Sequence, residues 1–463
     1  MAKLTSNKTY KAKQLNKFKK IVDYIPVSET ISDQLEESQL PFFTYGETNG
    51  KDDLSMLSLF SGCGGMDIGF EGGFICNKKS LPKNSSKIDY KVNGDWVMLK
   101  RNRFKTVFAN DILPEAMITW TRYMSRFGTD PWIYHTDSIV ELVKRHYAGE
   151  RVFPDHVDIV TGGFPCQDFS VAGKRKGFES DKSHDGTLRK EDVPTEETRG
   201  KLYYWMKQVI DITKPNIFIA ENVKGLVSLG DVRDIIQNDF SHADGDGYIV
   251  LPPQVLHAGN YGVPETRERV IFIGIRRKAL TKKALEALDS SDIPDEFNPY
   301  PSPTHNYNVG DKSLKKPVTC RDVFDGLKEP DDASDLSQRF YSKAKYLGKH
   351  CQGQIEIHLD GLGPTIRSEH HGNIEFRRLS AEHGGKHIEE LKQGLEERRL
   401  TPRECALIQT FPPDFKFVMK NENGKGMKLS SSGAYKVIGN AVPPVLANKI
   451  ATRLQELWPK YFG

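Results

Sequence analysis

One cysteine of the sequence lies where a nucleophile would have to be held. The segment GGFPCQDFSVAGKRKGF, residues 162–178, places Cys166 directly after Pro165, at the end of an apolar run and a Gly-Gly pair. Proline fixes the direction of the backbone, and a nucleophilic side chain needs a fixed position. The alternative is that Cys166 is a small buried hydrophobe, as a lone cysteine usually is. The rest of the chain has to distinguish these two interpretations.

Two later segments contain groups that suit acid catalysis and anion binding. IAENVKG ends another apolar run with Glu221, and burial there would disfavour the charged carboxylate and let the group donate a proton. ETRERVIFIGI places Arg267 and Arg269 on one side of an entering strand, where they could hold a carbonyl oxygen or a phosphate. Each of these residues, taken alone, could also be a surface group that forms a salt bridge.

A glycine-rich turn predicts a place for a ligand. In LFSGCGGMDIGF, Gly62, Gly64 and Gly65 follow an apolar strand and open a helix, which allows a tight turn and a close approach to the backbone. The spacing is not G-x-G-x-x-G, so a dinucleotide is disfavoured. Asp111 and Asp137 end the next two expected strands, where an acid can accept hydrogen bonds from ribose hydroxyls. Two such acids suit an adenosine, although ordinary exposed loop acids are the alternative.

The elements that position these residues follow a regular order. Apolar runs alternate with helical patterns such as LYYWMKQVIDITK, which is typical of a parallel α/β sheet. The alternation stops near Arg276, and TPRECALIQTF restores helical patterning with Thr401 as its N-cap and Glu404 three residues later. We therefore expect a helical, basic N-terminal extension (1–53), a catalytic domain (54–284), a smaller irregular domain (285–400) and a C-terminal segment (401–463) that returns to the catalytic domain.

Composition narrows the classes of protein. The net charge is only +4, but the first 20 residues contain seven lysines and no acid, so they form either a solvated tail or an arm that contacts phosphates. The six cysteines form no C-x-x-C pair, and we expect neither disulfides nor a metal site. No apolar run approaches the roughly 20 residues of a membrane helix. These features favour a reduced, cytoplasmic protein without a membrane partner.

The order of the segments resembles the DNA (cytosine-5) methyltransferases of the prokaryotic restriction-modification type. The matching segments are LSLFSGCGGMDIGF, FANDI, DIVTGGFPCQDFS, RGKLYYW, IAENVKG, GVPETRERVIFIGI, RRLTPRECALIQTFP and YKVIGNAVPP, in the family's order. The resemblance implies an S-adenosylmethionine-dependent, Rossmann-like mixed α/β sheet with a second, smaller and irregular target-recognition domain. Glu265 stands where the family usually has glutamine, and the stretch 76–104 and the loop after Cys166 are unusually long.

The resemblance also assigns roles to residues. It implies that Cys166 is the nucleophile, that Glu221 is the acid, and that Arg267 and Arg269 belong to the catalytic site. The cofactor is expected to be S-adenosylmethionine. Its pocket is expected to contain Phe60, Gly62, Gly64, Asp111, Ile112, Asp137, Ser138, Pro165, Leu202, Asn440 and Val442.

The expected reaction is methyl transfer to carbon-5 of a flipped-out cytosine in a specific site of double-stranded DNA, through a Cys166 adduct at carbon-6. The alternatives are a tRNA cytosine-5 methyltransferase and a catalytically inactive DNA-binding relative. We expect a monomer, with a restriction endonuclease as genetic partner and a short GC-containing palindrome as target. The candidate DNA contacts, which could also be solvated loop residues, are Ser170, Lys174 and Arg175 near phosphates and Arg367, His370, His371 and Arg377 near base edges.

Overall fold

The computed structural model describes residues 52–165, 202–228, 232–245, 247–368 and 374–463. Several of the predicted features lie outside these residues, namely most of the N-terminal extension and the polar loop 180–198. The site residues that lie outside are Cys166, Ser170, Lys174, Arg175, His370 and His371. Among the described residues, no helix is long and apolar enough to cross a membrane.

A mixed sheet forms the centre of the molecule, with strand order β10-β11-β8-β7-β1-β5-β6 and β9 paired to β11. Its parallel strands are β1 (Leu54–Leu59), β5 (Phe104–Asn110), β6 (Tyr134–His135), β7 (Ile159–Gly163) and β8 (Ile217–Val223). The antiparallel strands are β9 (Tyr248–Val250), β10 (Gln254–His257) and β11 (Glu268–Arg276). The predicted α/β fold class with a mixed sheet is confirmed.

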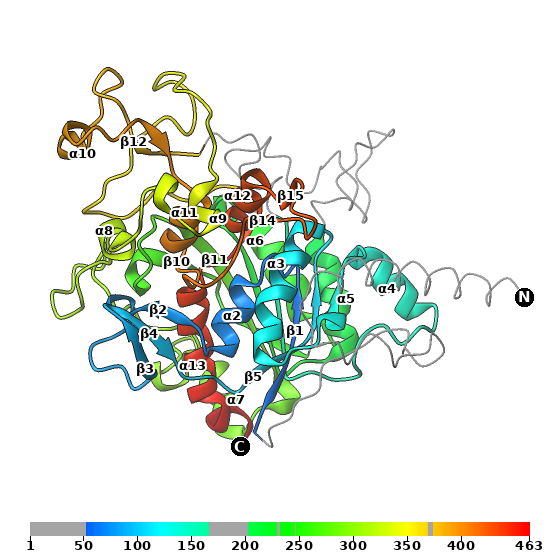
Figure 1. The fold of residues 1–463 in the computed structure, drawn as a ribbon. Coiled ribbons are helices and arrows are strands. Elements are labelled where there is room, and N and C mark those ends of the chain that lie inside the picture. The colour runs from blue at the N-terminus through cyan, green and yellow to red at the C-terminus, as the bar shows by residue number, and fades with distance from the viewer. Residues whose placement is uncertain (1–51, 166–201, 229–231, 246, 369–373) are drawn as a thin grey trace, which may run out of the picture.

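Helices cover both faces of this sheet, which explains why its central strands are largely apolar. Met56 and its same-face neighbours pack against one set of helices, and Leu57 points to the opposite face and a second set. The first set is α2 (Gly65–Glu71), α3 (Pro114–Met124) and α13 (Pro444–Phe462). The second set is α4 (Ile139–Tyr147), α5 (Leu202–Thr213) and α6 (Val232–Ser241) (Figure 1).

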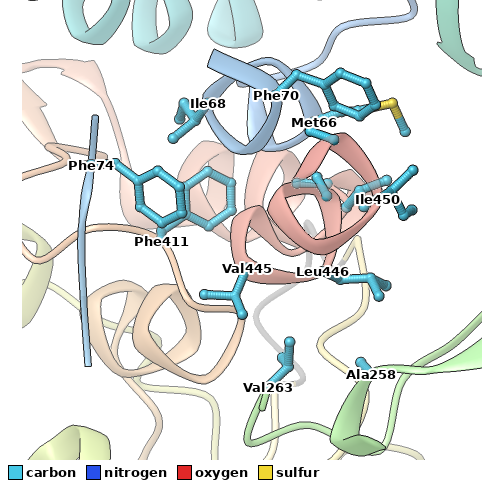
Figure 2. Packing of buried hydrophobic residues seen from close by; sticks show 14 of the residues in the cluster. Met66, Ile68, Phe70, Phe74, Ala258, Val263, Phe411, Val445, Leu446 and Ile450 are labelled. Atoms are coloured by element: carbon cyan, nitrogen blue, oxygen red, sulfur yellow. The ribbon is translucent and has the colours of Figure 1, made fainter. Parts of the chain in front are cut away.

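The C-terminal helix α13 packs closely against α2, the helix that follows the glycine-rich turn. Figure 2 shows Met66 and Phe70 of α2 in one apolar cluster with Leu446 and Ile450 of α13. A β-carbon on Gly69 would lie 2.5 Å from the Cβ of Ala447, so only glycine permits this approach. The predicted return of the C-terminal segment to the first domain is therefore visible as a helix–helix contact.

The long stretch between the first helix and the second strand forms a separate three-stranded antiparallel sheet. Its order is β2 (Ile75–Asn77), β4 (Trp96–Leu99) and β3 (Ile88–Asn93). The end of β2 and the turn after it contact the chain that follows β11, because Asn77 donates to the carbonyl oxygen of Asp322, at 3.1 Å, and Lys79 Nζ lies 2.7 Å from Asp322 Oδ1. His305 Nε2 lies 2.8 Å from the carbonyl oxygen of Lys79.

The chain after β11 begins as part of the first domain. The helix α7 (Lys282–Leu288) joins α13 through a hydrogen bond from Thr281 N to Tyr461 O, at 2.7 Å, and Tyr300 donates to the carbonyl oxygen of Ile271 in β11, at 2.9 Å. The domain boundary expected at 285 therefore does not coincide with a break in packing, because side chains near 288–300 complete the core of the sheet domain.

Short elements and long connections follow, as the irregular pattern of this region predicts. They are α8 (Cys320–Phe324), α9 (Leu336–Arg339), β12 (Phe376–Arg378), α10 (Ile388–Lys392) and β13 (Arg398–Arg399). In Figure 1, α8, β12 and α10 lie beside the central sheet rather than within it. The chain then returns through α11 (Pro402–Ile408), β14 (Met419–Lys420), β15 (Met427–Leu429) and α12 (Ser431–Asn440). The predicted Thr401–Glu404 capping box at the start of α11 is confirmed.

Candidate active site

The glycine-rich turn lies at the carboxyl end of β1 and is packed on two sides. Gly62 and Gly64 have φ angles of 54° and 88°, in the left-handed region that favours glycine. A β-carbon on Gly64 would lie 2.7 Å from Cδ1 of Trp120, and one on Gly65 would lie 2.2 Å from the carbonyl oxygen of Val442. A β-carbon on Gly62 would meet no atom within 4 Å. The turn is therefore open to a ligand on the side of Gly62.

Asp111 fixes this turn from the neighbouring strand. Its carboxylate accepts hydrogen bonds from the backbone N–H groups of Gly62, at 3.0 Å, and Leu113, at 2.9 Å. Burial raises the pKa of Asp111 to about 6, and the two N–H donors oppose that increase. Each carboxylate oxygen accepts one of these bonds, which leaves acceptor capacity on both oxygens. Ile112, the next residue, is 41% exposed.

A second buried carboxyl group lies beneath the turn and was not predicted from the sequence. Asp67 of α2 accepts hydrogen bonds from Ser58 Oγ, at 2.6 Å, and from Trp120 Nε1, at 2.5 Å. Burial raises the pKa of Asp67 to about 7. Trp120 in turn lies against Gly64, so Asp67 orients the ring that supports the turn. The signal in the sequence was an acid in the first turn of a short helix whose residues are mostly apolar or glycine.

The other predicted cofactor residues lie at the same edge of the sheet or pack near it. Asn110 at the end of β5 donates to the carbonyl oxygen of Asp137, at 2.8 Å, and Ser138 caps α4 by accepting from Val140 N, at 3.3 Å. Pro165 is half-buried just beyond β7, and Leu202 is buried at the start of α5. Phe60 follows β1, Asn440 is exposed at the end of α12, and Val442 is buried against Gly65.

Glu221 lies against the end of the strand that leads to Cys166. In the sheet, Glu221 of β8 is paired with Gly163 of β7, and a β-carbon on Gly163 would lie only 2.7 Å from Glu221 Oε2. Arg269 Nε lies 2.6 Å from Glu221 Oε1, and both side chains are about nine-tenths buried. The carboxyl group is thus held against Gly163, which lies three residues before the predicted nucleophile in the sequence.

Asn222 adds a constraint that sequence analysis missed. Its side-chain amide donates to the carbonyl oxygen of Phe164, at 3.1 Å, and is almost completely buried. This bond ties β8 to the residue that precedes Pro165, so the acid and the start of the Pro–Cys segment are fixed relative to each other.

Arg267 has different surroundings from Arg269. Its guanidinium group is fully buried and donates to three backbone carbonyl oxygens, those of Ile366, at 3.0 Å, Gly439, at 2.9 Å, and Ala441, at 2.7 Å. Glu265 Oε1 lies 3.5 Å from Arg267 Nη1, and burial raises the pKa of this carboxyl group. These bonds favour a positioning role for Arg267 and do not favour the direct catalytic role expected from the sequence.

The structure likewise argues against base-reading roles for Arg367 and Arg377. Arg377 is only 10% exposed in its side chain and lies 2.7 Å from Glu390. Arg367 Nη2 lies 3.2 Å from Glu375 Oε1, which is itself buried. A guanidinium group held by internal carboxylates would have to break these pairs to reach a base edge. The sequence pattern did not show these pairs, although Glu375 lies in the same segment as both arginines and Glu390 follows 13 residues after Arg377.

The chain is similar to known proteins over most of its length. Residues 54–456 match the family model described as C-5 cytosine-specific DNA methylase. The Type II methyltransferase M.BsuRI of Bacillus subtilis is 30% identical over 87% of this chain and 79% of its own length. The Type II methyltransferase M.BspRI of Lysinibacillus sphaericus is 31% identical over 89% of this chain and 83% of its own length.

Among solved structures, the S. pombe Dnmt2 methyltransferase is 17% identical over 88% of this chain and 99% of its own, with a TM-score of 0.49. The family assignment depends instead on the match across most of the chain and on relatives of similar length. The chain belongs to the C-5 cytosine-specific DNA methylase family.

Proposed function

We propose that this chain transfers a methyl group from S-adenosylmethionine to carbon-5 of a flipped-out cytosine in a specific site of double-stranded DNA. The reaction proceeds through a covalent adduct between Cys166 and carbon-6 of the base. The observation that supports this most is the Glu221–Arg269 pair, at 2.6 Å, held against the end of β7 just before the Pro–Cys segment. In a DNA cytosine methylase, that is where an acid and a carbonyl-binding group are needed.

The chemistry explains these residue types. Carbon-5 of cytosine is a weak nucleophile, and addition of a thiolate at carbon-6 makes the ring enamine-like and reactive at carbon-5. Glu221 donates a proton or a strong hydrogen bond to ring nitrogen-3, which stabilises the negative charge that the addition creates. Arg269 holds the carbonyl oxygen of the base. After carbon-5 has gained the methyl group, it loses its proton, the bond to Cys166 breaks, and the thiolate is restored.

The residues around the glycine-rich turn fit the proposed methyl donor. S-adenosylmethionine supplies an electrophilic methyl group on a sulfonium centre. The open side of Gly62 leaves room for the donor, and Asp111 keeps acceptor capacity for ribose hydroxyls beside the exposed Ile112. The proposed pocket also contains Phe60, Gly64, Asp137, Ser138, Pro165, Leu202, Asn440 and Val442.

Flipping a base out of a duplex costs a few kcal/mol of free energy, and contacts between the protein and the DNA backbone have to offset this cost. Ser170, Lys174 and Arg175 are proposed to contact phosphates, and His370 and His371 to read bases. These five residues lie outside the described part of the chain. The buried ion pairs of Arg367 and Arg377 disfavour base contacts by these arginines, so the two histidines are the better candidates within the proposed recognition region, 285–400.

The cellular setting is a further part of the proposal. The names of the relatives, Type II methyltransferases, support a place in a restriction-modification system with a restriction endonuclease as genetic partner. A cytoplasmic monomer fits that setting.

The test is transfer of tritium from methyl-labelled S-adenosylmethionine to duplex DNA and, in parallel, to tRNA. We expect label at carbon-5 of cytosine in DNA and none in tRNA. Label in tRNA alone would establish the alternative substrate, and no label in either would favour an inactive DNA-binding relative. Bisulfite sequencing of the methylated DNA then identifies the target site.

A further inference from the structure

A short segment of the second domain runs beside the entrance to β11. We call residues 363–368 the recognition seam, because they lead towards β12. Backbone hydrogen bonds join the seam to the catalytic domain, from Thr266 N to Gly363 O, at 2.9 Å, and from Gly363 N to Pro264 O, at 2.9 Å. Ile366 N donates to Glu265 Oε1, at 2.7 Å. The seam is thus fixed to the residues immediately before Arg267.

The opposite side of the recognition seam contacts the end of α12. A β-carbon on Gly439 would lie 2.1 Å from the carbonyl carbon of Arg367, so backbone packs directly on backbone. Ser368 Oγ donates to the carbonyl oxygen of Lys436 one turn earlier, at 3.2 Å. The seam therefore cannot shift without moving the last turn of α12.

The same end of α12 also contacts the glycine-rich turn. The carbonyl oxygen of Val442, just after α12, lies where a β-carbon on Gly65 would be, and Cys63 Sγ donates to the carbonyl oxygen of Val437, at 3.3 Å. The last turn of α12 with residues 441–442 thus has the proposed methyl-donor pocket on one side and the recognition seam on the other.

Arg267 connects these parts through one side chain. Its guanidinium group donates to Ile366 in the seam and to Gly439 and Ala441 at the end of α12. Because the group is planar and its donors are fixed relative to one another, the three carbonyl oxygens are fixed together. A shift of one of them would leave a buried polar group unpaired, which is unfavourable. Two residues later, Arg269 holds Glu221.

We propose that Glu265 and Arg267 form a positioning unit that couples the methyl-donor pocket to the recognition seam, so that the donor and duplex DNA bind cooperatively. This inference rests on the proposed function, because both ligands have to bind this chain. Glu265 fixes the seam through Ile366 N and faces Arg267, and Arg267 fixes the seam to α12. By linkage, each ligand then raises the affinity for the other by the same factor.

The chain contains a matched control for a role that is only structural. Arg399 is as buried as Arg267 and also donates to backbone carbonyl oxygens, including those of Ala344, at 2.7 Å, and Gly353, at 2.7 Å. These carbonyl oxygens belong to the second domain, so their bonds to Arg399 stabilise that domain, whereas the bonds of Arg267 join the recognition seam to the end of α12.

The experiment measures the dissociation constant of a duplex with and without S-adenosylhomocysteine, the demethylated donor, which prevents turnover. The duplex carries a site that the wild-type protein methylates. In the wild type, S-adenosylhomocysteine should tighten DNA binding by about 5-fold or more, a typical size for coupling between two sites. Arg267→Lys should reduce this factor to below about 2-fold, whereas Arg399→Lys should keep the wild-type factor even if it lowers stability.

Ser368→Ala provides a second variant that removes only a half-buried hydroxyl bond between the seam and α12. It should also lower the coupling factor, and it decides the question if Arg267→Lys does not fold. The proposal is wrong if the wild type binds both ligands independently, if the folded variants of Arg267 and Ser368 keep the full factor, or if Arg399→Lys loses as much coupling as Arg267→Lys. Failure of the wild type to bind either ligand would instead contradict the proposed function.

Discussion

At the scale of single residues, Arg267 and Arg269 show what spacing predicts and what it does not. Their spacing predicted a shared side of an entering strand; in the structure Arg267 precedes β11 and Arg269 lies within it, and Glu221 lies two residues before the end of β8. The sequence could not show that Arg269 would pair with Glu221 while Arg267 would be surrounded by carbonyl oxygens from residues 366, 439 and 441. Those partners of Arg267 are far away along the chain, so no local sequence pattern predicts these contacts.

Glu221→Gln should lower the single-turnover rate of methyl transfer by about 10²-fold or more, because the proton donor at nitrogen-3 is lost. The protein should remain folded, since the amide keeps the shape of the carboxyl group. Glu268→Gln is the control on the neighbouring strand, because the Glu268 carboxylate lies 2.9 Å from the exposed Lys224. A Glu221→Gln rate close to that of the control would exclude the proposed role.

Asp67 should make stability depend on pH. Burial raises its folded pKa to about 7, well above the usual value for an aspartate, so the folded state binds the proton more tightly than the unfolded state. The stability that this provides is complete below the unfolded pKa and is lost as the pH rises through about 7. The Asp67→Asn side chain does not titrate, so this variant should not lose that stability as the pH rises. Its free energy of unfolding should therefore rise relative to that of the wild type between a pH of about 5 and about 8, by at most ~1.4 kcal/mol per pH unit. Urea unfolding at both pH values measures this, and a constant difference would contradict it.

At the scale of elements, continuous apolar runs predicted the buried strands well. LSMLSLF and NIFIAENV correspond to β1 and β8, and the Thr401–Glu404 capping box begins α11 as expected. The sheet β2-β4-β3 was not predicted, since its strands are short and β3 is largely exposed. The strands β12 and β13 were missed for a similar reason, because arginines form them and their charges are neutralised only by tertiary contacts.

Arg377→Ala should destabilise the protein and leave the choice of DNA sequence unchanged. Arg377 pairs with Glu390, which also pairs with Arg378, so the loss should be on the order of 2 kcal/mol, less than for a carboxylate left without any partner. Denaturant unfolding measures the loss, and methylation of duplexes that differ by one base pair measures the ranking. A stable variant with an altered ranking would restore the base-reading role that the sequence suggested.

At the scale of the whole molecule, the sequence predicted one sheet domain with a smaller irregular part inserted before the C-terminal segment. It did not predict that residues 288–300 complete the core of the sheet domain, because residues 297 and 298 bond to α13, more than 150 residues later, and Tyr300 bonds to β11. The position of the recognition seam between β11 and α12 could not be predicted from the sequence either. Long-range packing of this kind leaves no periodic signal in the segment itself.

S-adenosylhomocysteine should raise the melting temperature without DNA, because a ligand that binds only the folded state stabilises it, by about 2.7 kcal/mol at 100 times its dissociation constant. Asp111→Ala should weaken this effect, since it removes the proposed acceptor of the ribose hydroxyls and the bond to Gly62. Calorimetry provides the affinity directly. An unchanged affinity in a folded Asp111→Ala variant would remove Asp111 from the proposed pocket.

The central claim is that Cys166 attacks the base, and covalent trapping tests it most directly. A duplex with 5-fluorocytosine at the target position cannot lose a proton from carbon-5, so the adduct should persist after methyl transfer. The wild-type protein with S-adenosylmethionine should form a complex with this duplex that survives denaturing electrophoresis, and Cys166→Ser should form none while still binding DNA. Trapping of the Ser variant at the wild-type level, or methylation of normal DNA by a wild-type protein that is never trapped, would contradict the account.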